Sequence, residues 1–244
     1  MAGTAIAAVI CAAGSSARMG KIKKEYCPLP GSADGLTVLG AVVSAFAAVG
    51  EIGTIVIAIP ANSEKGESAA RAALPPGLLA GKTGPAIHFV SGGETRRASV
   101  FNALSLLGGQ EQPPGIVLIH DGARPWVSPS LIRRIIGGAK TYRAMIPLMP
   151  IAETPKETDA PLDSDGPVFI AKHLRRALVG AAQTPQGFTF PEIFAAHQRV
   201  AAQDNPDYFE FTDDAEIWAF FCGRVAVIPG EPENRKITFP EDLC

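Results

Sequence analysis

The strongest constraint on this chain is a series of short apolar runs separated by longer, helix-favouring stretches. The runs that predict strands in the first part of the chain are Thr4–Cys11, Thr54–Pro60, Ala86–Gly93, Gly115–Pro125 (ending in a turn) and Ala144–Pro150. Strands that are apolar at every position are typical of parallel sheets covered by helices on both faces. Strands alternating with helices at this spacing form βαβ units. The sequence therefore predicts an α/β fold with a doubly wound, mostly parallel sheet.

Helices are expected between these strands and towards the end of the chain. The predicted helices are Leu36–Val49, a helix from a cap at Asn62 to about Ala73, Arg97–Leu107, one beginning at Ser128 and Pro129, Thr189–Ala202 and Asp213–Cys222. A last strand is predicted at Arg224–Gly230. Because ligands of such sheets bind beyond the carboxyl ends of the strands, residues just after each apolar run are the functional candidates.

Composition narrows the class of protein. With 244 residues and 47% hydrophobic residues, the chain can form one large domain spanning residues 1–244. A net charge of −2 argues against non-specific binding to nucleic acid. No window approaches the ~20 apolar residues of a membrane span, and the apolar start lacks a basic region, so we expect a buried strand and not a signal peptide.

The four cysteines are too widely spaced for a zinc site or a disulfide framework. They favour a reduced, cytoplasmic protein.

The segment Ile151–Arg176 breaks the strand–helix pattern. It is polar and proline-rich and has no helical period. One interpretation is a long surface loop, and the alternative is an extended arm or β-ribbon that projects from the sheet. Unstructured loops of this length are uncommon in compact domains and are usually functional or disordered.

The turn after the first apolar run combines small residues with positive charge. The turn is Ala12–Ser16, and the basic residues that follow it are Arg18, Lys21, Lys23 and Lys24. Backbone N–H groups in such a turn can hold phosphate oxygens, and the cations can neutralise a polyphosphate. An ordinary strand–helix turn followed by a solvated basic loop is the alternative.

Two common phosphate loops do not match this turn. A P-loop has four residues between its glycines and then Lys and Ser or Thr. Here Gly14 and Gly20 have five residues between them, and Lys21 is followed by Ile22. The dinucleotide fingerprint fails because Ser16 stands at its second glycine. Neither an ATPase nor a Rossmann dehydrogenase is favoured.

The pattern A-A-G-S-S-A-R-M-G…K-E-Y resembles the signature loop of the sugar-nucleotide pyrophosphorylase-type nucleotidyltransferases. More narrowly, it is similar to A-A-G-x-G-x-R-M-G…P-K-Q-Y of the methylerythritol phosphate cytidylyltransferases of non-mevalonate isoprenoid synthesis. The resemblance implies catalytic roles for Arg18 and Lys24. The residues that it implies for CTP binding in the turn are Ala12, Ala13, Gly14, Ser15 and Ser16. Lys24 stands one position nearer Arg18 than usual, so Lys21 and Lys23 remain alternatives.

Two further motifs follow predicted strands. Residues 92–100 are similar to the family's G-G-x-x-R-x-x-S-V, and residues 120–125, H-D-G-A-R-P, to H-D-A-A-R-P. The further CTP contacts that the resemblance implies are Gly93, Arg96, Ser99 and Gly122. It implies Asp121 and Arg124 for the second substrate. An ordinary helix start and a local Asp–Arg ion pair are the structural alternatives.

The C-terminal half carries the remaining motifs. A-Q-T-P-Q-G-F (182–188) and P-I-A-E-T-P-K (150–156) match family patterns, which implies that Thr184 and Thr154 contact methylerythritol phosphate. The segment Gly230–Leu243 implies a catalytic role for Lys236. Counting back from Thr184 as in the family implies Arg176, with its neighbour Arg175 as an alternative. T-D-D-A (212–215) also matches, and it is equally compatible with a helix N-cap.

The resemblance runs from about Ala5 to Asp242 and implies a reaction. A phosphate oxygen of the sugar alcohol attacks the α-phosphorus of CTP, and pyrophosphate leaves. Mg²⁺ is expected on the CTP phosphates, without a dedicated carboxylate cage. The family's arm, here residues 151–176, implies a homodimer with shared active sites. Because the chain stops at Cys244 without a second pathway enzyme, we expect any channelling to need a separate protein.

The departures from the family pattern keep alternatives open. Ser16 replaces a glycine, Glu25 replaces a glutamine near the triphosphate, and Gly122 replaces an alanine. A pentitol-phosphate cytidylyltransferase, such as a ribitol phosphate enzyme, shares most of these motifs. A non-catalytic nucleotide-binding protein on the same fold is a more distant alternative, and a purely structural protein does not explain polar residues at the end of strand after strand.

Overall fold

A computed structural model describes residues 5–16, 19–20, 22–32, 35–61, 64–80, 84–202 and 211–243. Arg18, Lys21 and the predicted helix cap Asn62 lie outside the described residues. The strands of the main sheet are β1 (Ile6–Cys11), β2 (Ile52–Ile59), β3 (Ala86–Ser91), β4 (Ile116–Asp121), β5 (Ala144–Pro150), β8 (Gly180–Ala182), β9 (Gln186–Thr189) and β10 (Ala226–Pro229). Their order is β10-β5-β9-β4-β1-β2-β3, with β8 paired to β5.

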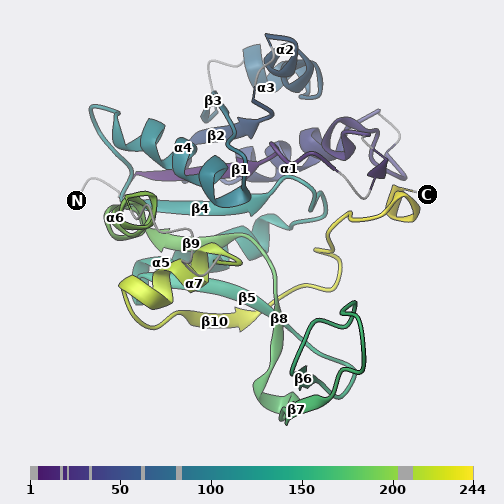
Figure 1. Ribbon diagram of the computed structural model, residues 1–244. Helices are drawn as coiled ribbons and strands as arrows, with labels where there is room; N and C mark the ends of the chain where they lie inside the picture. The colour runs from purple at the N-terminus through teal and green to yellow at the C-terminus, as the bar shows by residue number, and fades with distance from the viewer. Residues whose placement is uncertain are drawn as a thin grey trace.

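Helices cover both faces of this sheet (Figure 1). They are α1 (Val38–Ala47), α2 (Glu64–Ala72), α3 (Pro76–Ala80), α4 (Arg96–Gly108), α5 (Pro129–Tyr142), α6 (Phe190–Ala201) and α7 (Asp214–Phe221). The short 3-10 helices are η2 (Lys24–Tyr26), η3 (Arg176–Leu178) and η4 (Pro240–Leu243). Because β1 pairs in parallel with β2 and β4, and β2 with β3, the predicted doubly wound, mostly parallel α/β fold is confirmed.

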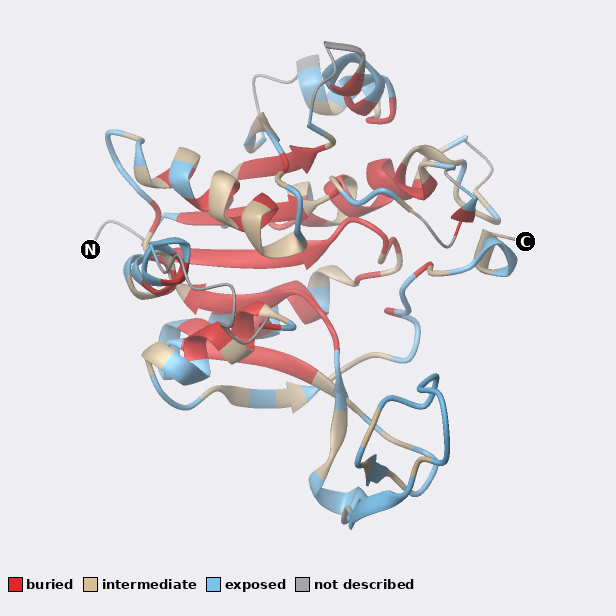
Figure 2. Cartoon of the chain, in the orientation of Figure 1, coloured by how far each residue is buried: buried red, intermediate tan, exposed pale blue. Residues whose placement is uncertain are grey.

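Two hydrophobic cores explain why the strands are apolar at every position. Ile6, Ala8 and Ile10 of β1 face a cluster that includes residues of α1, α2 and α5. The alternate residues Ala7 and Val9 face a second cluster with α4, α6 and α7. Both sets are buried, and Figure 2 shows the central strands as a continuous buried band. Each fully buried Val or Ile contributes about 1.5–3 kcal/mol.

Strand β9 was not predicted from the sequence. It lies between β4 and β5 and runs antiparallel to both. Gly187 in its middle permits this position, since a Cβ there would lie 2.6 Å from Cγ2 of Ile135 on α5. The strand carries the chain back from the segment 151–176, and Gln186 and the preceding Thr184 lie beside the end of β4.

The helix starts follow local capping chemistry. Ser128 accepts a hydrogen bond from the N–H of Leu131, with Pro129 at the first position of α5, as predicted. Thr95 caps α4 in the same way. Asp213 caps α7, accepting from the N–H of Glu216. Such a cap contributes about 1 kcal/mol.

The polar segment 151–176 contains a two-stranded antiparallel ribbon. Strands β6 (Lys156–Thr158) and β7 (Ile170–His173) pair with each other and project from the end of the main sheet (Figure 1). The large apolar side chains exposed on this segment and just after it are Leu162, Phe169, Ile170 and Leu178. The structure therefore has the β-ribbon that the sequence offered as the alternative to a long loop.

Candidate active site

A cleft of about 500 Å³ opens beyond the carboxyl ends of β1, β3 and β4. The residues predicted from the sequence that line it are Ala13, Gly14, Ser15, Ser16, Lys24, Gly93, Arg96, Ser99, Asp121 and Lys236. The C-terminal segment crosses this edge of the sheet, where Ile237 donates its N–H to the carbonyl of Ala123. Residues far apart in the sequence meet here because parallel strands end at one edge.

The turn after β1 is suited to bind an anion. Ser16 has a φ of 52°, in the left-handed region. The backbone N–H groups of Gly14, Ser15 and Ser16 donate no hydrogen bond to the described residues. The Oγ atom of Ser16 is buried and also has no partner among them. Successive free N–H groups around a left-handed residue form a concave anion site of the kind that binds phosphate.

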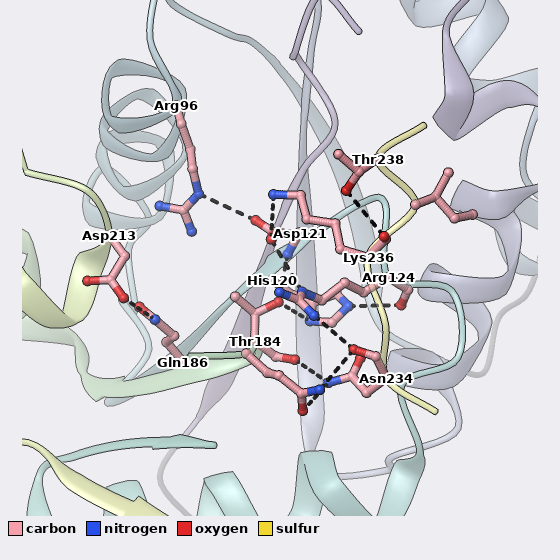
Figure 3. A network of polar contacts seen from close by, with 12 residues as sticks. Arg96, His120, Asp121, Arg124, Thr184, Gln186, Asp213, Asn234, Lys236 and Thr238 are labelled. Carbon is pink, nitrogen blue, oxygen red and sulfur yellow. Dashed lines mark hydrogen bonds and ion pairs between the residues drawn. The ribbon is translucent and has the colours of Figure 1, made fainter. Parts of the chain in front are cut away.

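Asp121, at the end of β4, is the centre of a charge cluster (Figure 3). One carboxylate oxygen lies 2.9 Å from Nζ of Lys236 and 3.4 Å from Nε of Arg124. The other lies 3.4 Å from Nε of Arg96. Burial disfavours the ionised carboxylate, but the three cations outweigh burial and hold the pKa of Asp121 well below its ordinary value. Asp121 therefore stays ionised and positions three cations.

A hydrogen-bond network beneath the cleft holds the end of β4. Thr184 Oγ1 accepts from the N–H of Asp121 at 3.1 Å and lies 2.9 Å from Nδ1 of His120. His120 Nε2 lies 3.3 Å from the carbonyl of Arg124, which can only accept, so Nε2 carries the proton and Nδ1 accepts from the threonine. Burial lowers the pKa of His120 to about 4. The histidine is therefore neutral at pH 7 and works as a structural linker.

A buried carboxylate on α7 supports Arg96 from the opposite side. One carboxylate oxygen of Asp214 lies 2.8 Å from Nη1 of Arg96, and the other lies 3.1 Å from Nε2 of His197. Burial opposes ionisation, but Arg96 and His197 outweigh it and hold the pKa of Asp214 below its ordinary value. The sequence analysis missed this role: T-D-D-A fitted an N-cap, and Asp213 is the cap.

The lysines of the basic segment differ in their contacts. Lys24 is buried, lines the cleft and donates a 2.8 Å hydrogen bond to the carbonyl of Ile237. Lys23 contacts the carbonyl of Gly14 at 2.6 Å and Glu25 at 3.0 Å. Of Lys23 and Lys24, the two lysines of this segment that the structure describes, Lys24 lines the cleft.

Other predicted site residues lie elsewhere. Those that pack beneath or beside the cleft rather than along its lining are Ala12, Gly122, Arg124 and Thr184. The backbone at Gly122 approaches β1 closely, since a Cβ there would lie 2.9 Å from the carbonyl oxygen of Cys11. Thr154 and Arg176 are exposed on the ribbon segment, where Arg176 donates to the carbonyl of Ala152. Conversely, Thr238 lines the cleft and was not singled out.

The acidic side chains that the structure describes do not form a metal cage. Within the described ranges there is no group of three or more His, Cys, Asp or Glu residues arranged to hold a metal ion. Asp121, which lines the cleft, already has both oxygens in ion pairs. In the same part of the chain, no helix is both long enough and apolar enough to span a bilayer.

Comparison with known proteins adds an independent observation. The family model for 2-C-methyl-D-erythritol 4-phosphate cytidylyltransferase, IspD, matches residues 6–244. The chain belongs to this family. An IspD relative from Pelotomaculum thermopropionicum, named 2-C-methyl-D-erythritol 4-phosphate cytidylyltransferase, is 34% identical over 239 residues, which cover 98% of this chain and 91% of the relative.

Other relatives are longer. The bifunctional enzyme IspD/IspF of Mesorhizobium japonicum is 35% identical over 98% of this chain, and the chain spans about half of that enzyme, 53% of its length. Two solved structures of family members are also similar over 98% of this chain and 95% of theirs. The Anaerococcus prevotii 4-diphosphocytidyl-2C-methyl-D-erythritol synthase has a TM-score of 0.76 at 27% identity, and the Thermus thermophilus cytidylyltransferase 0.67 at 28%.

Proposed function

We propose that this chain transfers CMP from CTP to 2-C-methyl-D-erythritol 4-phosphate, giving 4-diphosphocytidyl-2-C-methyl-D-erythritol and pyrophosphate. The observation that carries the proposal is the cleft, in which Lys24, Lys236 and Arg96 face a turn whose N–H groups donate no hydrogen bond to any residue that the structure describes. Both substrates are phosphate anions, and a site for joining them needs cations from several directions. Membership of the cytidylyltransferase family supports the choice of CTP and of methylerythritol phosphate.

The turn of residues 12–16 takes the triphosphate of CTP in this proposal, and Gly93, Arg96 and Ser99 take its nucleoside. The acceptor phosphate lies near Lys236, whose side chain is 37% exposed, lines the cleft and ends 2.9 Å from the carboxylate of Asp121. Its oxygen attacks the α-phosphorus, and the bond from that phosphorus to pyrophosphate breaks. The nucleophile is already an anion at pH 7, so no strong base is needed.

Charge stabilisation and positioning then supply the catalysis. Lys24, held by the carbonyl of Ile237, stabilises the negative charge on the α-phosphate and the departing pyrophosphate. Asp121 forms ion pairs with Lys236 and Arg96 and so keeps both cations at fixed positions when the substrate binds. Arg18, which lies outside the described residues, is proposed to act with Lys24 on the triphosphate because of its place in the family motif.

Mg²⁺ enters this proposal as part of the nucleotide substrate. The described residues supply no cage for it, and Asp121 is engaged by cations. The ion would be held by the phosphate oxygens of CTP. We further propose a cytoplasmic location, because the three described cysteines carry free thiols, which is typical of reducing compartments.

We also propose a homodimer in which the ribbon segment of one subunit completes the site of the other. Thr154 and Arg176 are exposed on this segment and do not line the cleft of their own chain. The exposed apolar side chains there favour burial against a second copy; Leu162 is 84% exposed and Leu178 is 78% exposed. Thr154 and Arg176 would then contact the acceptor substrate bound to the partner subunit.

The test follows pyrophosphate release with CTP and Mg²⁺, offering methylerythritol phosphate or ribitol phosphate. Release with methylerythritol phosphate, lost in Lys24→Ala and Lys236→Ala but kept in Lys140→Ala, supports the proposal. Lys140 is a suitable control because it forms an exposed ion pair with Glu51 at the opposite edge of the sheet. Pyrophosphate release with ribitol phosphate alone overturns the assignment of the acceptor substrate. If neither acceptor gives pyrophosphate, the proposed reaction is wrong.

A further inference from the structure

Glu25 lines the cleft, and the proposed reaction uses neither it nor Lys23, the residue with which it pairs. The Glu25 side chain lines the cleft, is 5% exposed, and lies 3.0 Å from Nζ of Lys23. The same Nζ donates a 2.6 Å hydrogen bond to the carbonyl of Gly14 in the turn after β1. One ammonium group therefore connects the anion-binding turn to η2.

A buried carboxylate is unfavourable at this position unless its charge is neutralised. Desolvation of an unpaired carboxylate is costly, and Glu25 also faces the cleft in which the triphosphate is proposed to bind. The family pattern has an uncharged proline and glutamine where this chain has Lys23 and Glu25. Both positions are therefore charged in this chain, with opposite signs and in direct contact.

The contact with Gly14 also fixes the orientation of one peptide group. In a planar trans peptide, the carbonyl of Gly14 and the N–H of Ser15 point in opposite directions. Because Lys23 holds the carbonyl, the N–H of Ser15 is turned away from the lysine. Ser15 lines the cleft, and this N–H donates no hydrogen bond within the described part of the chain.

We propose that Lys23 is a positioning residue for nucleotide binding, which holds the Gly14–Ser15 peptide in its anion-binding orientation and neutralises Glu25 beside the triphosphate. This inference rests on the proposed function, because it takes the triphosphate of CTP as the anion. Lys24 and Lys23 then differ in role. Lys24 lines the cleft, whereas Lys23 binds the protein's own carbonyl and carboxylate and touches no reacting atom.

The experiment is a double-mutant cycle on CTP affinity. The Kd of Mg·CTP is measured by calorimetry for the wild type, Lys23→Met, Glu25→Gln and the double variant, with kcat and KM for each. We expect Lys23→Met to raise Kd by about tenfold when Glu25 is present and by less than about threefold when it is glutamine. Glu25→Gln alone should lower Kd, because it removes a negative charge facing the triphosphate. Lys23→Arg should keep the wild-type Kd, and kcat should change little throughout.

Matched controls separate the outcomes. Lys140→Met removes a lysine from an exposed ion pair with Glu51 and should leave Kd unchanged. Equal effects of Lys23→Met in both backgrounds would overturn the neutralisation of Glu25. No effect beyond that of Lys140→Met would overturn the role of Lys23 as a whole, and either result leaves the proposed reaction intact. If Lys23→Met does not fold, Glu25→Gln still decides, since an unchanged or higher Kd overturns the inference. A wild type that does not bind CTP overturns the proposed function and this inference together.

Discussion

Replacing Asp214 by asparagine should destabilise the protein by about 2 kcal/mol at pH 7. The carboxylate is 1% exposed and contacts Arg96 at 2.8 Å and His197 at 3.1 Å. Breaking a fully buried ion pair costs about 3–5 kcal/mol. Three features reduce the expected value. The Arg96 side chain is 31% exposed and keeps Asp121, and an asparagine oxygen can still accept its hydrogen bond.

The contact with His197 should survive this substitution at small cost. Nδ1 of His197 is buried and has no hydrogen-bond partner among the described residues. The ring can therefore carry its proton on Nδ1 and accept from the asparagine amide through Nε2. The loss of stability then comes mainly from removing the charge of Asp214 beside Arg96, and not from leaving His197 without a hydrogen-bond partner.

The pH dependence gives the prediction a second test. The pKa of Asp214 is lower in the folded protein than in the unfolded chain. Its stabilisation is therefore fully present above the unfolded pKa, about 3.9, and is lost as the pH falls through and below that value. The difference between wild type and Asp214→Asn should be constant from about pH 6 to 8 and shrink in acid.

Urea unfolding followed by the fluorescence of buried Trp218 is a suitable assay, because this ring stacks on Phe188. Glu67→Gln is the matched control, since its ion pair with Arg71 is about half exposed and should change stability by less than about 0.5 kcal/mol. If Asp214→Asn costs no more than Glu67→Gln, or if its cost does not change in acid, the reasoning about the buried pair is wrong.

Three further predictions concern the site. Lys236→Met should lower the rate of pyrophosphate release about 10²–10³-fold with little change in urea stability, and a smaller loss would contradict a transition-state role. The pKa of His120 is about 4 in the folded protein. The free energy of unfolding of the wild type should therefore fall by up to about 3 kcal/mol between pH 6.5 and 4, because only the unfolded chain gains the proton in this range. If the slope of stability against pH is the same in His120→Gln, this reasoning is wrong. Gly92→Ala should lower the free energy of unfolding by about 1–3 kcal/mol in the same assay, because the new Cβ would contact that of Ala13 and lie 2.9 Å from Oγ of Ser99. Gly137→Ala is the control: open space surrounds this position, so the substitution should not destabilise the protein.

Some of the predicted site residues line the cleft, and others support it from beneath. Gly14 and Ser16 follow β1, Ser99 lies near the start of α4 after β3, and Asp121 ends β4. Because the carboxyl ends of parallel strands lie at one edge, the place of these residues in the cleft follows from local pattern and topology. Thr184 was expected on the substrate, and it lies beneath the cleft, holding the N–H of Asp121. Family motifs identify a residue without stating whether it touches the ligand or supports a neighbour.

The sequence by itself determined the strands β1 to β5 and β10, most of the helices that cover them and the edge at which the site lies, because these depend on apolar periodicity and local capping. Only the tertiary structure decided that β9 enters the sheet antiparallel, that Asp214 pairs with Arg96, and that Lys23 contacts both Gly14 and Glu25. The first depends on packing against α5, and the second joins residues 118 positions apart. Charge and hydrogen-bond pairing depend on distances of a few ångströms, which folding sets between segments whose own sequences do not encode them.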